Sequence, residues 1–286
     1  MVDIQLNKLN KGKNMSNKEQ YEAETGSKYK MRSSKVLRTI REGKVARILK
    51  CNTSDAKVAE IFAMAKPDAL WLCMEHTSLT YEQAEHQVRA AKMHDVDALM
   101  RVSRGGYSDY IRPLEIDCAG LIIPQIESLA DAIKVRDMTK FAPLGERGND
   151  GGNNDAAFTK VDMLDYLTTS NKERFVCYQI EHPRVIDDLD AIAELEGVDA
   201  LFFGPGDYSI ALGVPGEMQH PEIKRVRELV AKVARKNNKI AATVGSPAIV
   251  GDYIGMGYNL LNIGADVVAL INYAEETLEA FDKIKY

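Results

Sequence analysis

Short apolar runs recur along the chain, and each is followed by a stretch whose apolar positions have helical spacing. The runs are continuous rather than alternating, which is typical of parallel strands covered on both faces. We predict one strand in each of eight runs, at residues 45–51, 69–75, 97–102, 120–126, 174–181, 200–207, 239–244 and 260–270.

The stretches between the runs carry helix signals. Residues 182–197 have Pro183 near the start, a stripe of apolar positions and Gly197 as a stop. Ser128 with Asp131 three residues later resembles a capping box. Eight strand–helix units in about 250 residues predict an α/β fold, a single-domain (β/α)8 TIM barrel. The alternative is an open doubly wound sheet, but the sequence has no GxGxxG after the first run to favour it.

Two segments depart from this repeat. Residues 1–34 are polar and lysine-rich, so we expect a loosely ordered N-terminal arm ahead of a barrel catalytic domain at residues 35–286. The interval before the fifth run is long and contains GERGNDGGNNDAAF. Its Gly, Asn and Asp residues predict a long loop near residues 143–172, folded over the barrel mouth.

Composition narrows the function classes. The chain of 286 residues is 45% hydrophobic and 28% charged, as in ordinary globular proteins, and its net charge of -5 does not favour nucleic acid. No apolar run approaches the ~20 residues that cross a bilayer, so we expect no membrane span. The four cysteines are scattered without a CxxC pair, and the N-terminus lacks a signal-peptide core. We therefore expect reduced thiols and a cytoplasmic location.

Polar residues interrupt the apolar runs near their carboxyl ends, where barrel enzymes place their chemistry. His76 follows the second run, Arg101 lies in the third, and Glu181 and Asp207 end the fifth and sixth. His76 precedes Arg101 by 25 residues and Glu181 precedes Asp207 by 26, about one repeat unit in each case. We therefore expect each pair at the same height on adjacent strands, around one pocket.

The two acids predict a metal site. Neighbouring carboxylates raise the pKa of one of them unless a cation lies between them. Mg²⁺ accepts one or two protein carboxylates and completes its octahedron with water and substrate oxygens. Glu181 and Asp207 are therefore candidate ligands of a divalent metal ion, and a 2-oxo acid would supply two further oxygens.

Asp207 follows a Gly-Pro-Gly sequence that we expect to form a rigid turn. Gly204 and Gly206 let the backbone approach a ligand closely, and Pro205 stiffens the turn. Exposed N–H groups in such a turn could hold a substrate carboxylate.

An ordered set of motifs resembles the HpcH/HpaI aldolase/citrate lyase family of class II, metal-dependent pyruvate aldolases. The similarity spans residues 35–272 approximately, and GVDALFFGPGDYSIALG is its most specific piece. The pieces are MEHT (74–77), LMRV (99–102), IIPQIES (122–128), GERG (145–148), QIE (179–181) and GVDALFFGPGDYSIALG (197–213).

The resemblance implies reversible cleavage of a 4-hydroxy-2-oxo acid to pyruvate, or a similar 2-oxo acid, and an aldehyde. It assigns Glu181 and Asp207 as ligands of Mg²⁺, or of Mn²⁺ or Co²⁺. It assigns Arg101 to the developing enolate oxygen and His76 to proton relay. Family oligomers, often hexamers, suggest a homo-oligomer.

The resemblance also assigns pyruvate binding to Gln179 and to the turn formed by Gly204, Pro205 and Gly206. An acid on a helix, Glu115 in this chain, is the residue expected to support the histidine.

The chain departs from the family pattern at three positions. Cys73 replaces a usual Asp, Asp117 replaces a common Gly shortly after Glu115, and Lys50 replaces a small hydroxyl residue. Three alternatives stay open: a Schiff-base aldolase using Lys50, a CoA-thioester lyase of the citrate lyase β-subunit type, and a non-catalytic barrel that binds a 2-oxo acid.

Overall fold

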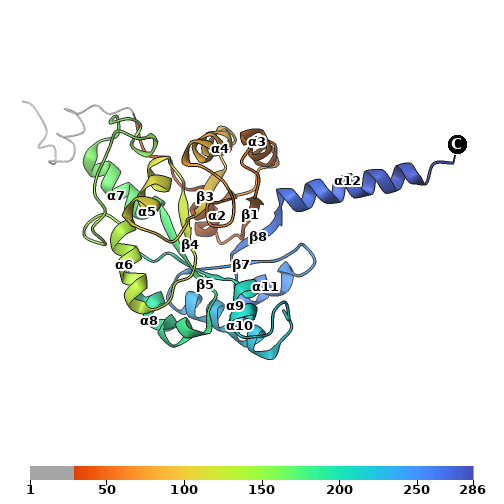
Figure 1. Cartoon of the computed structure of the whole chain (residues 1–286). Helices are drawn as coiled ribbons and strands as arrows, with labels where there is room; N and C mark the ends of the chain where they lie inside the picture. Colours follow the sequence, from red (N-terminus) through yellow and green to blue (C-terminus); the bar gives the residue numbers. More distant parts are fainter. Residues whose placement is uncertain (1–28, 286) are drawn as a thin grey trace, which may run out of the picture.

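The apolar runs form eight parallel strands that pair in sequence order and close by pairing of β8 with β1 (Figure 1). The structure, a computed structural model, describes residues 29–285. The predicted (β/α)8 barrel is therefore confirmed. The strands are β1 (Ala46–Cys51), β2 (Ala69–Cys73), β3 (Asp97–Arg101), β4 (Gly120–Ile123), β5 (Phe175–Ile180), β6 (Ala200–Phe203), β7 (Ile240–Val244) and β8 (Leu260–Ala265).

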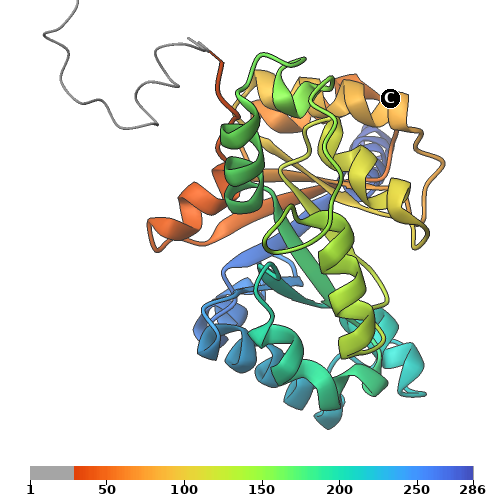
Figure 2. The same cartoon turned by 90° about the vertical axis from the view of Figure 1, so that its left-hand side faces the viewer.

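Helices alternate with the strands and cover the outside of the barrel (Figures 1 and 2). As the sequence predicts, Ser128 caps α6 by accepting a hydrogen bond from the Asp131 N–H at 3.2 Å. The helices are α2 (Lys35–Arg41), α3 (Ala56–Met64), α4 (Tyr81–Met93), α5 (Tyr107–Glu115), α6 (Leu129–Thr139), α7 (Met163–Glu173), α8 (Leu189–Glu194), α9 (Pro205–Ala211), α10 (Pro221–Lys236), α11 (Val250–Met256) and α12 (Asp266–Asp282), with 3-10 turns η2 (Asn154–Ala156) and η3 (Pro183–Asp188).

The strands are apolar throughout because both of their faces are covered. One buried cluster fills the barrel interior, where Ile48, Trp71 and Phe202 lie. A second cluster lies between the strands and the helices and includes Leu72 and Val226. A strand that is buried on both faces carries apolar residues at successive positions instead of alternating apolar and polar ones, which explains the continuous runs.

Three predicted elements end differently in the structure. Residues 204–207 and 266–270 begin helices instead of extending strands, because Pro205 and Asp266 start α9 and α12. The stretch 182–197 is not one helix: the 3-10 turn η3 precedes the short helix α8.

The predicted long loop is partly helical, and it packs on the side of the barrel instead of over the mouth. Asp162 caps α7, and Tyr166 in this helix is buried against Phe141. Arg147 is buried within the loop, where it contacts Asp155 at 3.3 Å and the Tyr166 hydroxyl at 3.0 Å. Arg147 therefore holds the loop together and has no place at the mouth.

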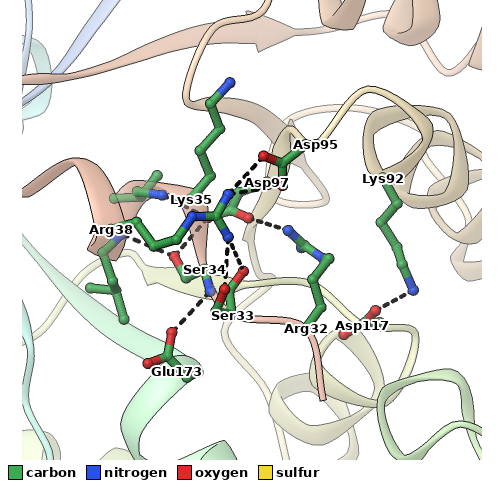
Figure 3. A network of polar contacts seen from close by, with 12 residues as sticks. Arg32, Ser33, Ser34, Lys35, Arg38, Lys92, Asp95, Asp97, Asp117 and Glu173 are labelled. Atoms are coloured by element: carbon green, nitrogen blue, oxygen red, sulfur yellow. Dashed lines mark hydrogen bonds and ion pairs between the residues drawn. The ribbon is translucent and has the colours of Figure 1, made fainter. Parts of the chain in front are cut away.

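Helix α2 closes the amino end of the barrel, where its Val36 side chain joins the interior cluster. The buried carboxylate of Asp97, at the start of β3, accepts hydrogen bonds from Arg32, Ser34 and the Val36 N–H (Figure 3). Burial favours a higher pKa for Asp117 beside this network, but Arg174 and Lys92 outweigh burial and lower it. The described part of the expected arm, residues 29–34, thus contacts the barrel; residues 1–28 lie outside the described residues.

Helix α12 leaves the barrel after β8 and projects away from it (Figures 1 and 2). Its 17 residues make a rod of about 25 Å with exposed apolar side chains, Leu270 at 55%, Leu278 at 65% and Phe281 at 60% among them. No helix within residues 29–285 combines the length and the apolar character needed to cross a membrane.

Candidate active site

Glu181 lies directly after β5 and is held by two amide groups. The backbone N–H of Gln125, at the end of β4, donates a 2.5 Å hydrogen bond to Glu181 Oε1. The side chain of Gln179 donates to Glu181 Oε2. Glu181 is only 5% exposed, so its carboxylate is fixed at the carboxyl end of the barrel.

Asp207 is presented by the first turn of α9, where the sequence predicted a non-helical turn. Gly204 is the residue before the helix and Pro205 its first residue, a position that suits the fixed φ of proline. A Cβ at Gly204 would lie 3.0 Å from Gln179 Nε2 and from Glu181 Oε2, so glycine here makes room for the acid. Gly206 faces open space.

The pKa of Glu181 responds to burial and to its neighbouring acids. Burial raises the pKa of Glu181 to about 7; the Gln125 N–H opposes this shift, and the Asp207 and Glu75 carboxylates add to it. Asp207 is exposed and makes no hydrogen bond or ion pair with the described residues. A buried acid beside an unpaired acid is the environment that a cation stabilises.

The residues present fit a hard divalent cation bound by two carboxylates. Within residues 29–285, no group of three or more His, Cys, Asp or Glu residues is arranged to hold a metal. Two acids suffice for Mg²⁺, which retains several non-protein oxygens. Gln179 Oε1 is also buried without a hydrogen-bond partner, so the site has an unused oxygen acceptor next to Glu181.

Arg101 is buried inside the barrel and is already engaged. Its Nε lies 3.0 Å from Glu75 Oε2, and its Nε and Nη2 lie 3.3 and 3.2 Å from the Cys73 sulfur. Its guanidinium also covers the Trp71 ring at 4.9 Å from the centroid. The position of Arg101 is therefore fixed from three sides.

His76 lies on the rim, with a side chain that is 58% exposed. The acid that reaches it is Glu75, whose Oε2 lies 3.3 Å from His76 Nε2. The expected supporting acid, Glu115, instead lies near Arg147 on the outside of the barrel. Within the single chain, the structure therefore does not bring Glu115 and His76 together.

A cavity of about 260 Å³ joins these side chains. It is smaller than the ~300–1,000 Å³ typical of larger ligands and therefore suits a small acid. His76, Glu181 and Asp207 line it, whereas Arg101 and Gln179 reach it through Glu75 and Glu181. The structure thus places His76, Glu181 and Asp207 on one cavity, with Arg101 and Gln179 one side chain away from it.

The equal height predicted within each pair is wrong. Arg101 is the register partner of Cys73, so His76 lies three residues beyond that level. Ile180 pairs with Phe203, which places Asp207 three residues beyond the level of Glu181. The loops after the strands, and not the register, bring these side chains to one pocket.

The sequence analysis assigned no role in the site to Gln125 or Glu75. Gln125 has φ of 52°, an uncommon conformation for a non-glycine residue that recurs at functional sites. Both residues lie within motifs of the sequence, MEHT and IIPQIES, which was the available signal. Their importance comes from contacts between strands, Gln125 to Glu181 and Glu75 to Arg101.

A closed parallel barrel with acids, an arginine and a small cavity at the carboxyl ends of its strands has the architecture of a barrel enzyme. The family model described as HpcH/HpaI aldolase/citrate lyase matches residues 48–273. The chain belongs to this family, as its motifs predicted, and at the level of the family the prediction of a carbon–carbon lyase is confirmed.

The chain is also similar to individual proteins and to solved structures of this family. The 2-keto-3-deoxy-L-rhamnonate aldolase of Salmonella gallinarum is 28% identical over 248 residues, which are 86% of this chain and 92% of that protein. The structure of an HpcH/HpaI aldolase from Desulfitobacterium hafniense matches with a TM-score of 0.82 and 28% identity, over 87% of this chain and 97% of the other. The structure of a family member from Burkholderia cenocepacia matches with a TM-score of 0.81 and 27% identity, over 88% of this chain and 100% of the other.

Proposed function

We propose that the protein is a metal-dependent class II aldolase. It cleaves a 4-hydroxy-2-oxo acid reversibly to pyruvate, or a close 2-oxo acid, and an aldehyde. The observation that carries the proposal is the acid pair, buried Glu181 and unpaired Asp207, on one small cavity in a barrel of this family.

Glu181 and Asp207 are the residues that would hold the cation, Mg²⁺, Mn²⁺ or Co²⁺. A bound divalent cation supplies Lewis acidity toward a carbonyl oxygen. Gln179 and Gln125 keep Glu181 in place, and the N–H groups of the first turn of α9, at Gly206 and Asp207, face a substrate carboxylate.

Arg101 stabilises the negative charge that develops on the enolate oxygen when the C3–C4 bond breaks. Its guanidinium is held in advance by Cys73 and Glu75, so little reorganisation is needed during the reaction. Fixed donors of this kind usually contribute the largest catalytic effect.

His76 accepts the proton of the C4 hydroxyl, directly or through water, and returns a proton to the C3 carbon. A histidine suits both steps because its ordinary pKa is ~6.5, near neutral pH. Glu75, whose Oε2 lies 3.3 Å from His76 Nε2, orients the ring.

We also propose that the enzyme is a cytoplasmic homo-oligomer. The four cysteines are free and buried, which supports a reducing compartment. In a (β/α)8 barrel the helix after β8 normally covers β8 and β1, but here α12 projects away, and Leu49 and Ile263 on those strands are only partly buried. An α12 from a second copy fits that uncovered face, and reciprocal exchange would bury the apolar helix in both copies.

A pyruvate-coupled assay tests the proposal. Purified protein is given a panel of 4-hydroxy-2-oxo acids with Mg²⁺, Mn²⁺ or Co²⁺, and then with EDTA. Metal-dependent release of pyruvate is expected. Activity that survives EDTA and is trapped by borohydride would indicate a Schiff-base aldolase, and metal binding without pyruvate release would indicate a non-catalytic barrel.

A further inference from the structure

Lys50 is a cation inside the barrel that the proposed mechanism does not use. Ala46 and Ile48 on β1 belong to the interior cluster, so Lys50, two residues further along, faces the same interior at the carboxyl end. Its Nζ lies 5.0 Å from the centroid of the Trp71 ring, the ring that also contacts Arg101. Two cations therefore share one indole.

Lys50 has no counter-charge of its own. Apart from the Trp71 ring, it makes no hydrogen bond or ion pair with the described residues. Burial lowers the pKa of Lys50, and the nearby Arg101 lowers it further. A cation in such surroundings is costly unless an anion joins it.

The acidic groups near Lys50 are occupied elsewhere. Asp266 accepts hydrogen bonds from Asn52, Thr53 and its own helix. Glu75 pairs with Arg101 at 3.0 Å and accepts from Gln125 Nε2 at 3.2 Å. Neither acid therefore forms an ion pair with Lys50 Nζ.

Unpartnered polar atoms on adjacent strands support a ligand site here. Trp71 Nε1 on β2 and Asn262 Oδ1 on β8 have no hydrogen-bond partner, although these residues are only 3% and 8% exposed. Trp71 is the register partner of Lys50, and Asn262 is the register partner of Ile48 on the same strand. Buried polar groups normally find partners, so a donor and an acceptor left free beside a free cation indicate a polar occupant.

We propose that Lys50, with Trp71 Nε1 and Asn262, forms a subsite for the carboxylate of an acid-bearing acceptor aldehyde. Lys50 Nζ and Trp71 Nε1 donate to the carboxylate, and Asn262 Oδ1 accepts from a substrate hydroxyl. A carboxylate fits better than a phosphate, because one ammonium balances one negative charge and Arg101 is already paired.

The subsite rests on the proposed aldolase function and extends it. Glu181 and Asp207 follow β5 and β6, whereas Lys50 is on β1, opposite β5 in a closed eight-stranded barrel. Glu75 lines the cavity at the acids and pairs with Arg101 on β3, and Arg101 shares the Trp71 ring with Lys50, so we place the far end of a bound 2-oxo acid along this row of side chains toward β1. Lys50 then meets the part of the substrate that becomes the aldehyde.

The test is the selectivity between acid and neutral aldehydes in the synthetic direction with pyruvate. Glyoxylate and succinate semialdehyde are compared with acetaldehyde and butanal, for the wild type, Lys50→Met and Lys50→Arg. Lys50→Met should lower the acid-to-neutral ratio of kcat/KM by about tenfold or more, the value of a charge-assisted hydrogen bond. Lys50→Arg should keep most of the ratio, and Lys232→Met, on the exposed side of α10, should change neither activity.

Two further measurements separate this proposal from the function it rests on. Metal-dependent deuterium exchange into the pyruvate methyl group, followed by mass spectrometry, requires the acid pair but no aldehyde. If the wild type shows no exchange, the aldolase proposal itself is wrong. If exchange occurs but Lys50→Met lowers acid and neutral rates equally, or glycolaldehyde phosphate is preferred to both acids, the subsite proposal is wrong. A borohydride-stable pyruvate adduct on Lys50 would also overturn it, since Lys50 would then be a nucleophile.

Discussion

The backbone N–H of Gln125 donates a 2.5 Å hydrogen bond to Oε1 of Glu181, and this bond connects the ends of β4 and β5. Because the donor is main chain, no side-chain substitution at residue 125 other than proline removes it. The left-handed backbone at Gln125, with φ of 52°, aims this N–H at the acid. The candidate metal ligand is thus oriented by the fold itself, and four predictions follow from the surroundings of this acid and of α12.

Replacing Gly204 with alanine should damage the acid pair. The new Cβ would lie 3.0 Å from Gln179 Nε2 and from Glu181 Oε2, so Glu181 must shift. We expect a loss of about 1–3 kcal/mol in the free energy of unfolding and at least a tenfold weaker metal affinity. Urea unfolding and calorimetric metal titration measure these effects.

Gly206→Ala is the matched control in the same turn, since nothing lies within 4 Å of its Cβ position. Its free energy of unfolding should equal that of the wild type or exceed it by up to about 1 kcal/mol. Equal losses in both variants would show that the crowding at Gly204 is not the cause.

Asp207→Asn should abolish metal-dependent turnover without unfolding the protein. Asp207 is exposed and unpaired, so its charge contributes little to the fold. We expect kcat/KM to fall at least about 100-fold, with unchanged circular dichroism and urea midpoint. Asp190→Asn, which removes an exposed acid on α8, should behave as the wild type. Near-normal metal affinity in Asp207→Asn would remove this residue from the metal site.

Glu181 should make the metal-free protein less stable as the pH rises. Its folded pKa of about 7 exceeds the unfolded value, so between roughly pH 4.5 and pH 7 the folded state binds more protons and stability falls with rising pH. Glu181→Gln lacks this titration. Between pH 4.5 and pH 8 in EDTA, the free energy of unfolding of the variant should rise by about 2–3 kcal/mol relative to that of the wild type.

Urea unfolding at the two pH values, with and without Mg²⁺, measures this difference. Added Mg²⁺ should stabilise the wild type most at pH 8, where Glu181 is ionised. A pH-independent difference between the two proteins would contradict the raised pKa.

Charged substitutions on α12 should dissociate the homo-oligomer. Leu270 and Ile271 are 55% and 53% exposed in the single chain, and burial of both by a second copy would be lost in a Leu270→Glu/Ile271→Glu variant. We expect a smaller species in analytical ultracentrifugation and a lower melting temperature. Glu275→Gln, a polar change on the same helix, is the control. A wild type that is monomeric at micromolar concentration would contradict the exchange of α12.

The barrel could be predicted from the sequence because its strands are buried on both faces, so that local apolar runs mark them directly. The place of the two acids could be predicted because acidic residues that directly follow apolar strands lie at the carboxyl end of a barrel. The hydrogen bond from the Gln125 N–H to Glu181 could not, since it depends on the left-handed backbone at Gln125 after β4. The direction of α12 could not be predicted either, because the apolar positions of a helix do not indicate whether the helix packs on its own chain or on a second copy.

Helix α2, which closes the amino end of the barrel, has a practical consequence for anyone who shortens this protein. Asp97 is fully buried, and its partners Arg32, Ser34 and the Val36 N–H all come from the segment ahead of the first strand. A chain that begins at the first residue of α2 would lose Arg32 and Ser34 and leave the buried carboxylate with the Val36 N–H alone, and breaking a buried ion pair in this way costs about 3–5 kcal/mol. Deletions and fusion joints therefore belong upstream of Arg32, well before the point at which the barrel visibly begins.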